Sequence, residues 1–136
     1  MKMENEFIPY EQALALKELG FDEPCLGWYL PEIVDKGNVA SVILGSYITK
    51  WNKFGDRLSV PTFSQAFRWF RNKYGYLHHI TYFDPYKAQT PGNADYQGYV
   101  LFPHAGIHKL PKMSYDTYEE AELACFIKLI EIIKTK

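Results

Sequence analysis

The sequence lacks any apolar run near the roughly 20 residues that a membrane-spanning helix needs, and MKMENEFIPY lacks the basic start and apolar centre of a signal peptide. Its only cysteines are Cys25 and Cys125, and they do not have CxxC spacing. This argues against a disulfide framework and a zinc ribbon. We therefore expect a cytoplasmic protein with no membrane partner, in which both thiols are reduced and buried.

Motifs for catalysis are also missing. There is no GxSxG, no GxxxxGK[ST], no GxGxxG and no HExxH. The paired carboxylates Glu119 and Glu120 fall where a helix would begin, and they suit the helix dipole there. We therefore predict no catalytic residue and no cofactor, and we keep an enzyme only as a third interpretation.

The four histidines all lie between positions 78 and 108. His104 and His108 have the four-residue spacing of two metal ligands on one helix face, but Pro103 and Gly106 disfavour a helix there. The sequence therefore predicts no metal site. A site assembled in space would make a metal-dependent enzyme the remaining alternative.

The chain is long enough to bury a core and has the length of one domain, so we expect a single α+β domain over residues 1–136. Turn residues and hydrophobic periodicity predict three helices and an antiparallel sheet of about four strands in two layers, in the order α-ββα-ββα. The expected helices cover 9–19, 62–74 and 117–134, and the expected strands cover 25–30, 39–48, 77–83 and 96–102. Thr62 with Gln65, and Thr117 with Glu120, have capping-box spacing, and Gly45 suggests a bulge.

Charge is unevenly distributed along the chain. Residues 1–23 carry six acids against Lys2 and Lys17, whereas residues 50–83 hold every arginine of the protein and only one acid, Asp56. A local excess of positive charge favours an anionic ligand.

The helix expected over 62–74 carries this positive charge beside aromatic rings. Phe63, Phe67, Phe70 and Tyr74 fall on one stripe at helical period, and Trp69 lies off that stripe. Trp69 can therefore cover the edge of the core, which is the usual place of Trp. It can instead stack on a ligand ring while Arg68 or Arg71 holds a phosphate.

The strand expected after this helix alternates between two faces. His78 and Tyr82 point to one face and His79 to the other. Each face therefore presents a histidine and an aromatic ring, which either stabilise the sheet as cross-strand pairs or contact a ligand. The candidate ligand-binding residues are Arg68, Trp69, Arg71, His78, His79 and Tyr82.

The last helix is apolar on two sides. Leu123, Ile127 and Ile130 lie away from the main stripe of this helix. Either the first helix covers them, or they form the interface of a homodimer or of a complex with a host protein.

Three stretches resemble uncharacterised short reading frames of phages and prophages of the Bacteroidetes. They are FIPYEQALALKELGFDEPC (residues 7–25), QAFRWFRNKYG (65–75) and TYEEAELACFIKLIEIIK (117–134). The family has no assigned activity, so the resemblance transfers no functional residue. It implies a small phage-type accessory protein.

Together these patterns favour a non-enzymatic protein that binds a phosphate-bearing or aromatic ligand, such as a nucleotide or single-stranded nucleic acid. The alternative is a protein interaction module or homodimer that acts on a host protein.

Overall fold

The structure is a computed structural model that describes residues 6–37, 40–82, 96–102, 106–111 and 115–135, without the side chains at 46, 96–102, 108 and 109. The chain divides into two compact units, Met1–Ala66 and Phe67–Lys136, and each is described by itself. Helix α3 (Phe63–Tyr74) begins in the first unit and ends in the second. Compactness does not report whether the units unfold together, so the expectation of one domain over 1–136 stays a prediction.

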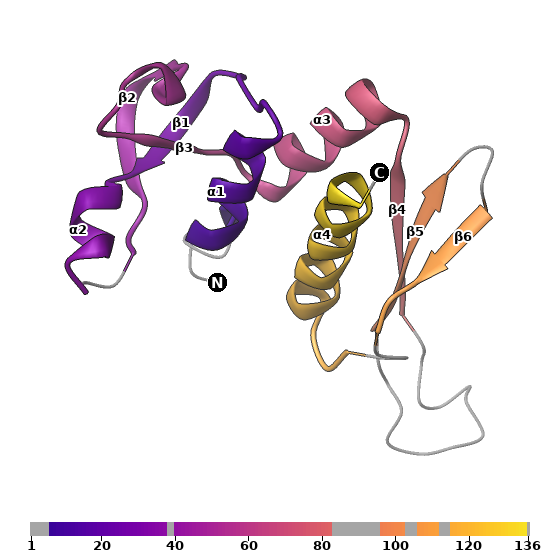
Figure 1. Ribbon diagram of the computed structural model, residues 1–136. Coiled ribbons are helices and arrows are strands. Elements are labelled where there is room, and N and C mark those ends of the chain that lie inside the picture. Colours follow the sequence, from indigo (N-terminus) through magenta and orange to yellow (C-terminus); the bar gives the residue numbers. More distant parts are fainter. Residues whose placement is uncertain (1–5, 38–39, 83–95, 103–105, 112–114, 136) are drawn as a thin grey trace. The chain divides into compact units, whose positions relative to one another are not determined.

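The first unit contains a small sheet with short helices (Figure 1). Its elements are α1 (Tyr10–Glu18), β1 (Cys25–Tyr29), α2 (Pro31–Asp35), β2 (Ile43–Thr49), the 3-10 helix η2 (Trp51–Lys53) and β3 (Leu58–Val60). The strands are antiparallel, in the order β2-β1-β3. The β1–β2 register is irregular between the pairs Gly27↔Leu44 and Cys25↔Thr49, the part of β2 that contains Gly45. An irregularity at this glycine agrees with the bulge expected there.

Apolar burial explains how the first unit holds together. Its described core includes Ile8, Leu16, Phe21, Trp51, Leu58 and Val60. Helix α1 ends at Glu18 with Leu19 as its C-cap, and the next residue, Gly20, has a positive φ of 93°, the left-handed conformation that glycine adopts at low cost after a helix. The Tyr29 hydroxyl donates a hydrogen bond of 2.9 Å to the backbone oxygen of Ile8, so its polar tip is satisfied inside the core.

The second unit contains the end of α3, three strands and the last helix. The strands β4 (Leu77–Tyr82), β5 (Tyr96–Phe102) and β6 (Gly106–Lys109) are antiparallel in the order β4-β5-β6. Helix α4 (Tyr118–Lys134) packs along β5 and β4 (Figure 1). Phe126 of α4 meets Phe67 and Phe70 of α3 edge to face, with ring centroids 5.8 and 5.4 Å apart. These rings join the two helices in one core.

At both expected helix starts the threonine hydroxyl caps the helix. Thr117 Oγ1 accepts a hydrogen bond from the Glu120 amide at 3.1 Å, and Thr62 Oγ1 accepts one from the Gln65 amide at 3.2 Å. The Gln65 side chain makes a tertiary contact, because its amide nitrogen donates to the Pro24 backbone oxygen at 2.8 Å.

The α+β class and the antiparallel pairing are confirmed, and all four expected strands form. The short strands β3 and β6 complete two three-stranded sheets, whereas the sequence pattern suggested one sheet of about four strands. Both lie next to prolines, Pro61 and Pro111, where periodicity is too short to read. In the described ranges no helix is long and apolar enough to span a bilayer.

Candidate functional site

Helix α3 presents positive charge away from its packed stripe. Its apolar side is buried, whereas Arg68, Arg71 and Lys73 are exposed. Arg68 and Arg71 make no ion pair with any carboxylate in the described parts of the chain. The helix itself carries no acid. Among the described residues, Arg68 and Arg71 therefore have no carboxylate to compensate their charge, and α3 carries the positive charge that the sequence indicated.

Trp69 is only 6% exposed and belongs to the packing of the helix. Its ring meets Phe70 and Tyr74 edge to face, at centroid distances of 5.2 and 5.7 Å. The ammonium group of Lys73 lies 4.9 Å from the Trp69 ring centroid. This agrees with the packing interpretation, and Trp69 offers little surface on which a ligand ring could stack.

His78 of β4 faces α3. Its imidazole is stacked on the phenyl ring of Phe67, with centroids 3.6 Å apart and an angle of 13° between the planes. Burial, with smaller electrostatic contributions from Arg71 and His79, lowers the pKa of His78 to about 4. The ring is thus neutral at pH 7 and lies in a positive local potential.

His79 and Tyr82 are the exposed members of the predicted set on β4. Because side chains alternate along a strand, His79 points to the opposite face from His78, and Tyr82 is 54% exposed at the strand end. The side chains of β5, including Tyr96 and Tyr99, lie outside the described residues. Of the predicted residues, the structure brings Arg71 and His79 each within electrostatic reach of His78.

The expected interface on α4 has a single exposed member. Ile127 is 42% exposed, Leu123 is half-buried and Ile130 is 7% exposed. Ile130 thus already belongs to the buried part of the chain, and the interface stays a prediction that depends mainly on Ile127.

The cysteines and histidines show no arrangement for catalysis in the described chain. Burial, with a smaller contribution from Glu23, raises the pKa of the Cys25 thiol to about 12, so it is not a ready nucleophile. Within the described ranges, no three His, Cys, Asp or Glu side chains are grouped to hold a metal ion. His104 and the side chain of His108 lie outside these ranges.

The sequence reasoning missed a group of aromatic rings around Arg57 in the first unit. The Arg57 guanidinium carbon lies 4.9 Å from the Trp28 ring centroid, 5.0 Å from that of Trp51 and 5.6 Å from that of Phe54. Tyr47 joins this group through Trp51, at a centroid distance of 5.6 Å. We call these five residues the Arg57 cluster. The three-residue steps from Trp51 to Phe54 and Arg57 were its only local signal.

The loop that carries this cluster is fixed by hydrogen bonds. Asn52 and Ser59 bond reciprocally, each backbone amide donating at 2.9 Å to the other side chain. Asn52 Nδ2 also donates to the Phe21 backbone oxygen at 3.1 Å. Beneath the loop, Trp51 Nε1 donates to the backbone oxygen of Cys25 at 2.6 Å. These hydrogen bonds hold the loop in place beneath the exposed rings of the cluster, which favours binding of a partner.

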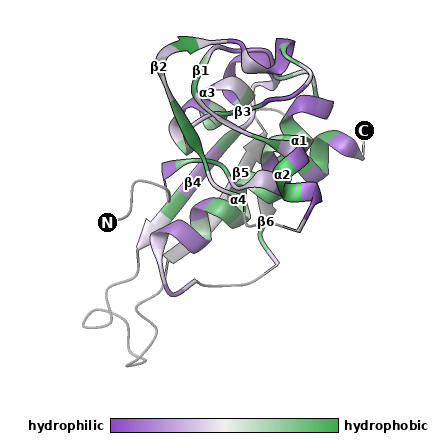
Figure 2. Cartoon of the chain, turned by 90° about the vertical axis from the view of Figure 1, so that its left-hand side faces the viewer, coloured by the Kyte–Doolittle hydropathy of each residue, from purple (hydrophilic) through white to green (hydrophobic). Residues whose placement is uncertain are grey.

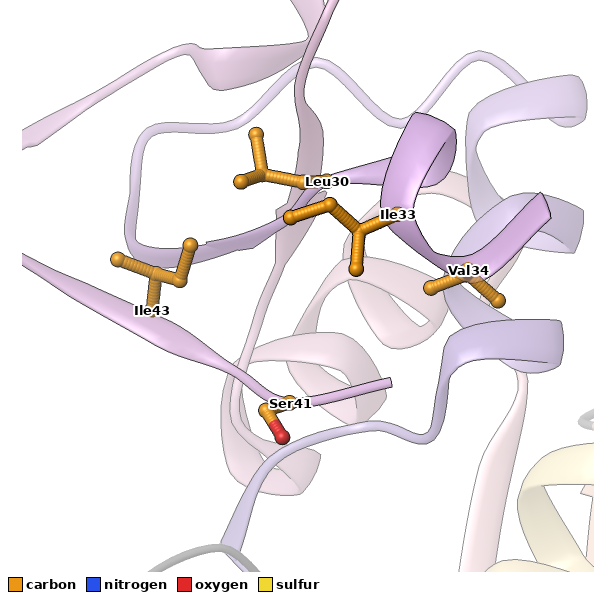
Figure 3. A pocket seen from close by; sticks show the side chains of 5 residues that line it. All are labelled: Leu30, Ile33, Val34, Ser41 and Ile43. Atoms are coloured by element: carbon orange, nitrogen blue, oxygen red, sulfur yellow. The ribbon is translucent and has the colours of Figure 1, made fainter. Parts of the chain in front are cut away.

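Two pockets lie on the two sides of α2. One has a volume of about 190 Å³ and is lined by Leu30, Ile33, Val34, Ser41 and Ile43; Figure 3 shows the Leu30 and Ile33 side chains on α2's side and Ile43 on the other. The other, of about 430 Å³, is lined by Pro31, Glu32, Asp35, Lys36, Gly55 and Asp56. The first pocket is thus apolar, and the second is acidic.

Comparison with protein-family models, with curated proteins and with solved structures finds no match to this chain. The function is therefore inferred from the described residues and their geometry.

Proposed function

We propose that the protein is a non-enzymatic accessory protein that binds a phosphate-bearing ligand, a nucleotide or single-stranded nucleic acid, through the exposed side of α3 and the adjoining part of β4. Arg68 and Arg71 supply the cations, and Tyr82, which is 54% exposed at the end of β4, offers an aromatic ring to a base.

The observation that carries this proposal is the local potential around Arg71. After burial, the main cause, Arg71 lowers the pKa of His78, so the positive charge of Arg71 acts at this ring. No described carboxylate forms an ion pair with Arg71. A bound anion would supply a counter-charge to Arg71, and phosphate oxygens match the donors of arginine in geometry and charge.

The resemblance of the three stretches to phage reading frames supports an accessory role, because such small proteins commonly act by binding. It does not select the ligand. The residue chemistry favours a phosphate, since a neutral ring ligand would leave Arg68 and Arg71 without a counter-charge.

Fluorescence anisotropy with labelled oligothymidylate, and calorimetry with mononucleotides, test this proposal at low and at raised salt. We expect binding that weakens with salt and that Arg68→Ala with Arg71→Ala reduces at least about tenfold. Lys17→Ala, which removes an exposed charge on α1, is the matched control and should change little. No binding of any of these probes, or equal losses in both variants, would exclude the proposed site.

A second readout is the titration of His78 by NMR. Phosphate bound beside Arg71 should raise the pKa of His78 from about 4, because an anion stabilises the imidazolium. An unchanged titration in the presence of a ligand that does bind would place that ligand elsewhere.

A further inference from the structure

In the first unit, strand β2 and the loop after η2 carry several exposed apolar side chains. Tyr47 is 62% exposed, Ile48 65%, Leu44 44% and Phe54 48%. Figure 2 shows green, apolar segments along β2. Scattered single apolar residues are normal on a surface, but a group on one strand and its loop marks an interaction site.

Strand β2 is also an open edge of its sheet. The order β2-β1-β3 leaves β2 paired on one side only among the described strands. Edge strands are usually protected by charge, proline or short length, whereas ILGSYIT has neither charge nor proline over seven residues. Its unpaired backbone groups can therefore receive an extended peptide.

The acidic pocket borders the same surface through the loop after η2. Phe54 belongs to the Arg57 cluster, and the next two residues, Gly55 and Asp56, line the acidic pocket with α2. Its single cation, Lys36, is bound to Glu32 at 3.2 Å. Asp35 and Asp56 form no ion pair with another described residue. The pocket thus has a net negative charge beside exposed rings.

We propose that this surface docks an extended peptide segment of a partner protein, with an apolar or proline residue against Phe54 and Tyr47 and a lysine or arginine in the acidic pocket. The charge of the pocket selects this partner. A nucleic acid would bring phosphates to Asp35 and Asp56, and a second copy of β2 would bring no cation, because β2 is uncharged.

The apolar pocket on the other side of α2 extends the surface. Ile33 and Ile43 line it and are 45% and 37% exposed. Its size suits one aliphatic side chain of the same peptide. Specificity would thus come from an apolar pocket and an acidic pocket on the two sides of α2.

The test is selection of the full-length protein against a displayed library of random peptides, followed by anisotropy with the labelled consensus peptide. We expect a consensus that joins an apolar or proline residue to lysine or arginine. Phe54→Ser and Tyr47→Ser should each lower the affinity for this peptide about tenfold. Leu14→Ser, an exposed apolar residue of α1, is the matched control and should have no effect.

Charge recognition is tested by a double-mutant cycle. Asp56→Asn should weaken binding of the consensus peptide. It should not weaken binding of the same peptide with its basic residue changed to alanine. A consensus without a basic residue, or equal effects on both peptides, would overturn the proposal. Dimerisation abolished by Tyr47→Ser, or oligothymidylate binding abolished by Phe54→Ser, would also overturn it, in favour of a second copy or of nucleic acid.

Discussion

The imidazole of His78 lies flat against the ring of Phe67, with 3.6 Å between ring centroids. This contact joins β4 to α3 and places a titratable ring at the edge of the core of the second unit. Because the neutral ring is the one that stacks and is half-buried, protonation works against the fold. Stability should therefore depend on pH through His78.

Protonation of His78 should destabilise the fold at acidic pH. An unfolded histidine binds its proton near pH 6.5, whereas the folded His78 does so near pH 4. Between these values protonation favours the unfolded state, so this contribution is complete above about pH 6.5 and is lost as the pH falls towards 4. Since the ring is partly screened by water, we expect a loss of roughly 1 to 2 kcal/mol in the free energy of unfolding. Urea titrations at about pH 7 and about pH 4.5 measure it.

His78→Phe removes the titration and keeps an aromatic ring on Phe67. This variant should lose less stability than the wild type over the same pH interval, whereas His79→Gln should keep most of the wild-type pH dependence, because burial is the main cause of the lowered pKa. Parallel pH profiles for wild type and His78→Phe would contradict the lowered pKa.

Two glycines of the first unit provide a matched pair of substitutions. A Cβ at Gly45 would lie 2.9 Å from the Trp28 ring, 3.1 Å from the Trp51 ring and 3.2 Å from the Tyr47 backbone oxygen. Gly45→Ala should therefore lower the free energy of unfolding by about 1 to 3 kcal/mol. At Gly55 nothing lies within 4 Å, so Gly55→Ala should be neutral or slightly stabilising. Equal effects in urea unfolding would show that the Trp28 and Trp51 rings are not packed against β2.

Asn52→Ala tests how the Arg57 cluster is held. The substitution removes a side chain that accepts from the Ser59 amide and donates to the Phe21 oxygen. Leaving these groups without partners should cost about 2 to 3 kcal/mol. Lys53→Ala, at the next and exposed position, should change stability by less than about 0.5 kcal/mol. A comparable loss of stability in both variants would show that the Asn52 side chain does not hold the loop.

The cysteines should be inert in the folded protein. Cys25 is 1% exposed and its pKa is raised to about 12, and Cys125 is fully buried. A thiol-specific chromogenic reagent near pH 8 should therefore react only on unfolding, and then with both thiols. Rapid reaction of one thiol in the native protein would show that its burial is incomplete.

Local periodicity was sufficient to predict the three longer helices and four of the strands. The helix stripe with Phe63, Phe67 and Phe70 is legible because each buried residue recurs at the helical period. Strands β3 and β6 were missed because three or four residues beside a proline give no period to read. Their pairing partners, β1 and β5, decide that they are strands.

The candidate binding residues could also be predicted only in part from the sequence. The positive charge of Arg68 and Arg71 was visible in sequence, since no acid lies near them in the chain. Whether Trp69 is open or covered depends on rings that meet it in space, and its 6% exposure follows from that packing. The Arg57 cluster unites Trp28 with residues nineteen or more positions away, so no local pattern could place it.

The sequence by itself determined the α+β class, the main helices and strands and the positive charge of α3, because these follow from local periodicity and composition. Only the tertiary structure decided which rings and charges are exposed, because exposure depends on neighbours that are distant in the chain. Antiparallel pairing of β2 with β1 creates the Arg57 cluster, and the stacking of α3 on β4 makes His78 neutral.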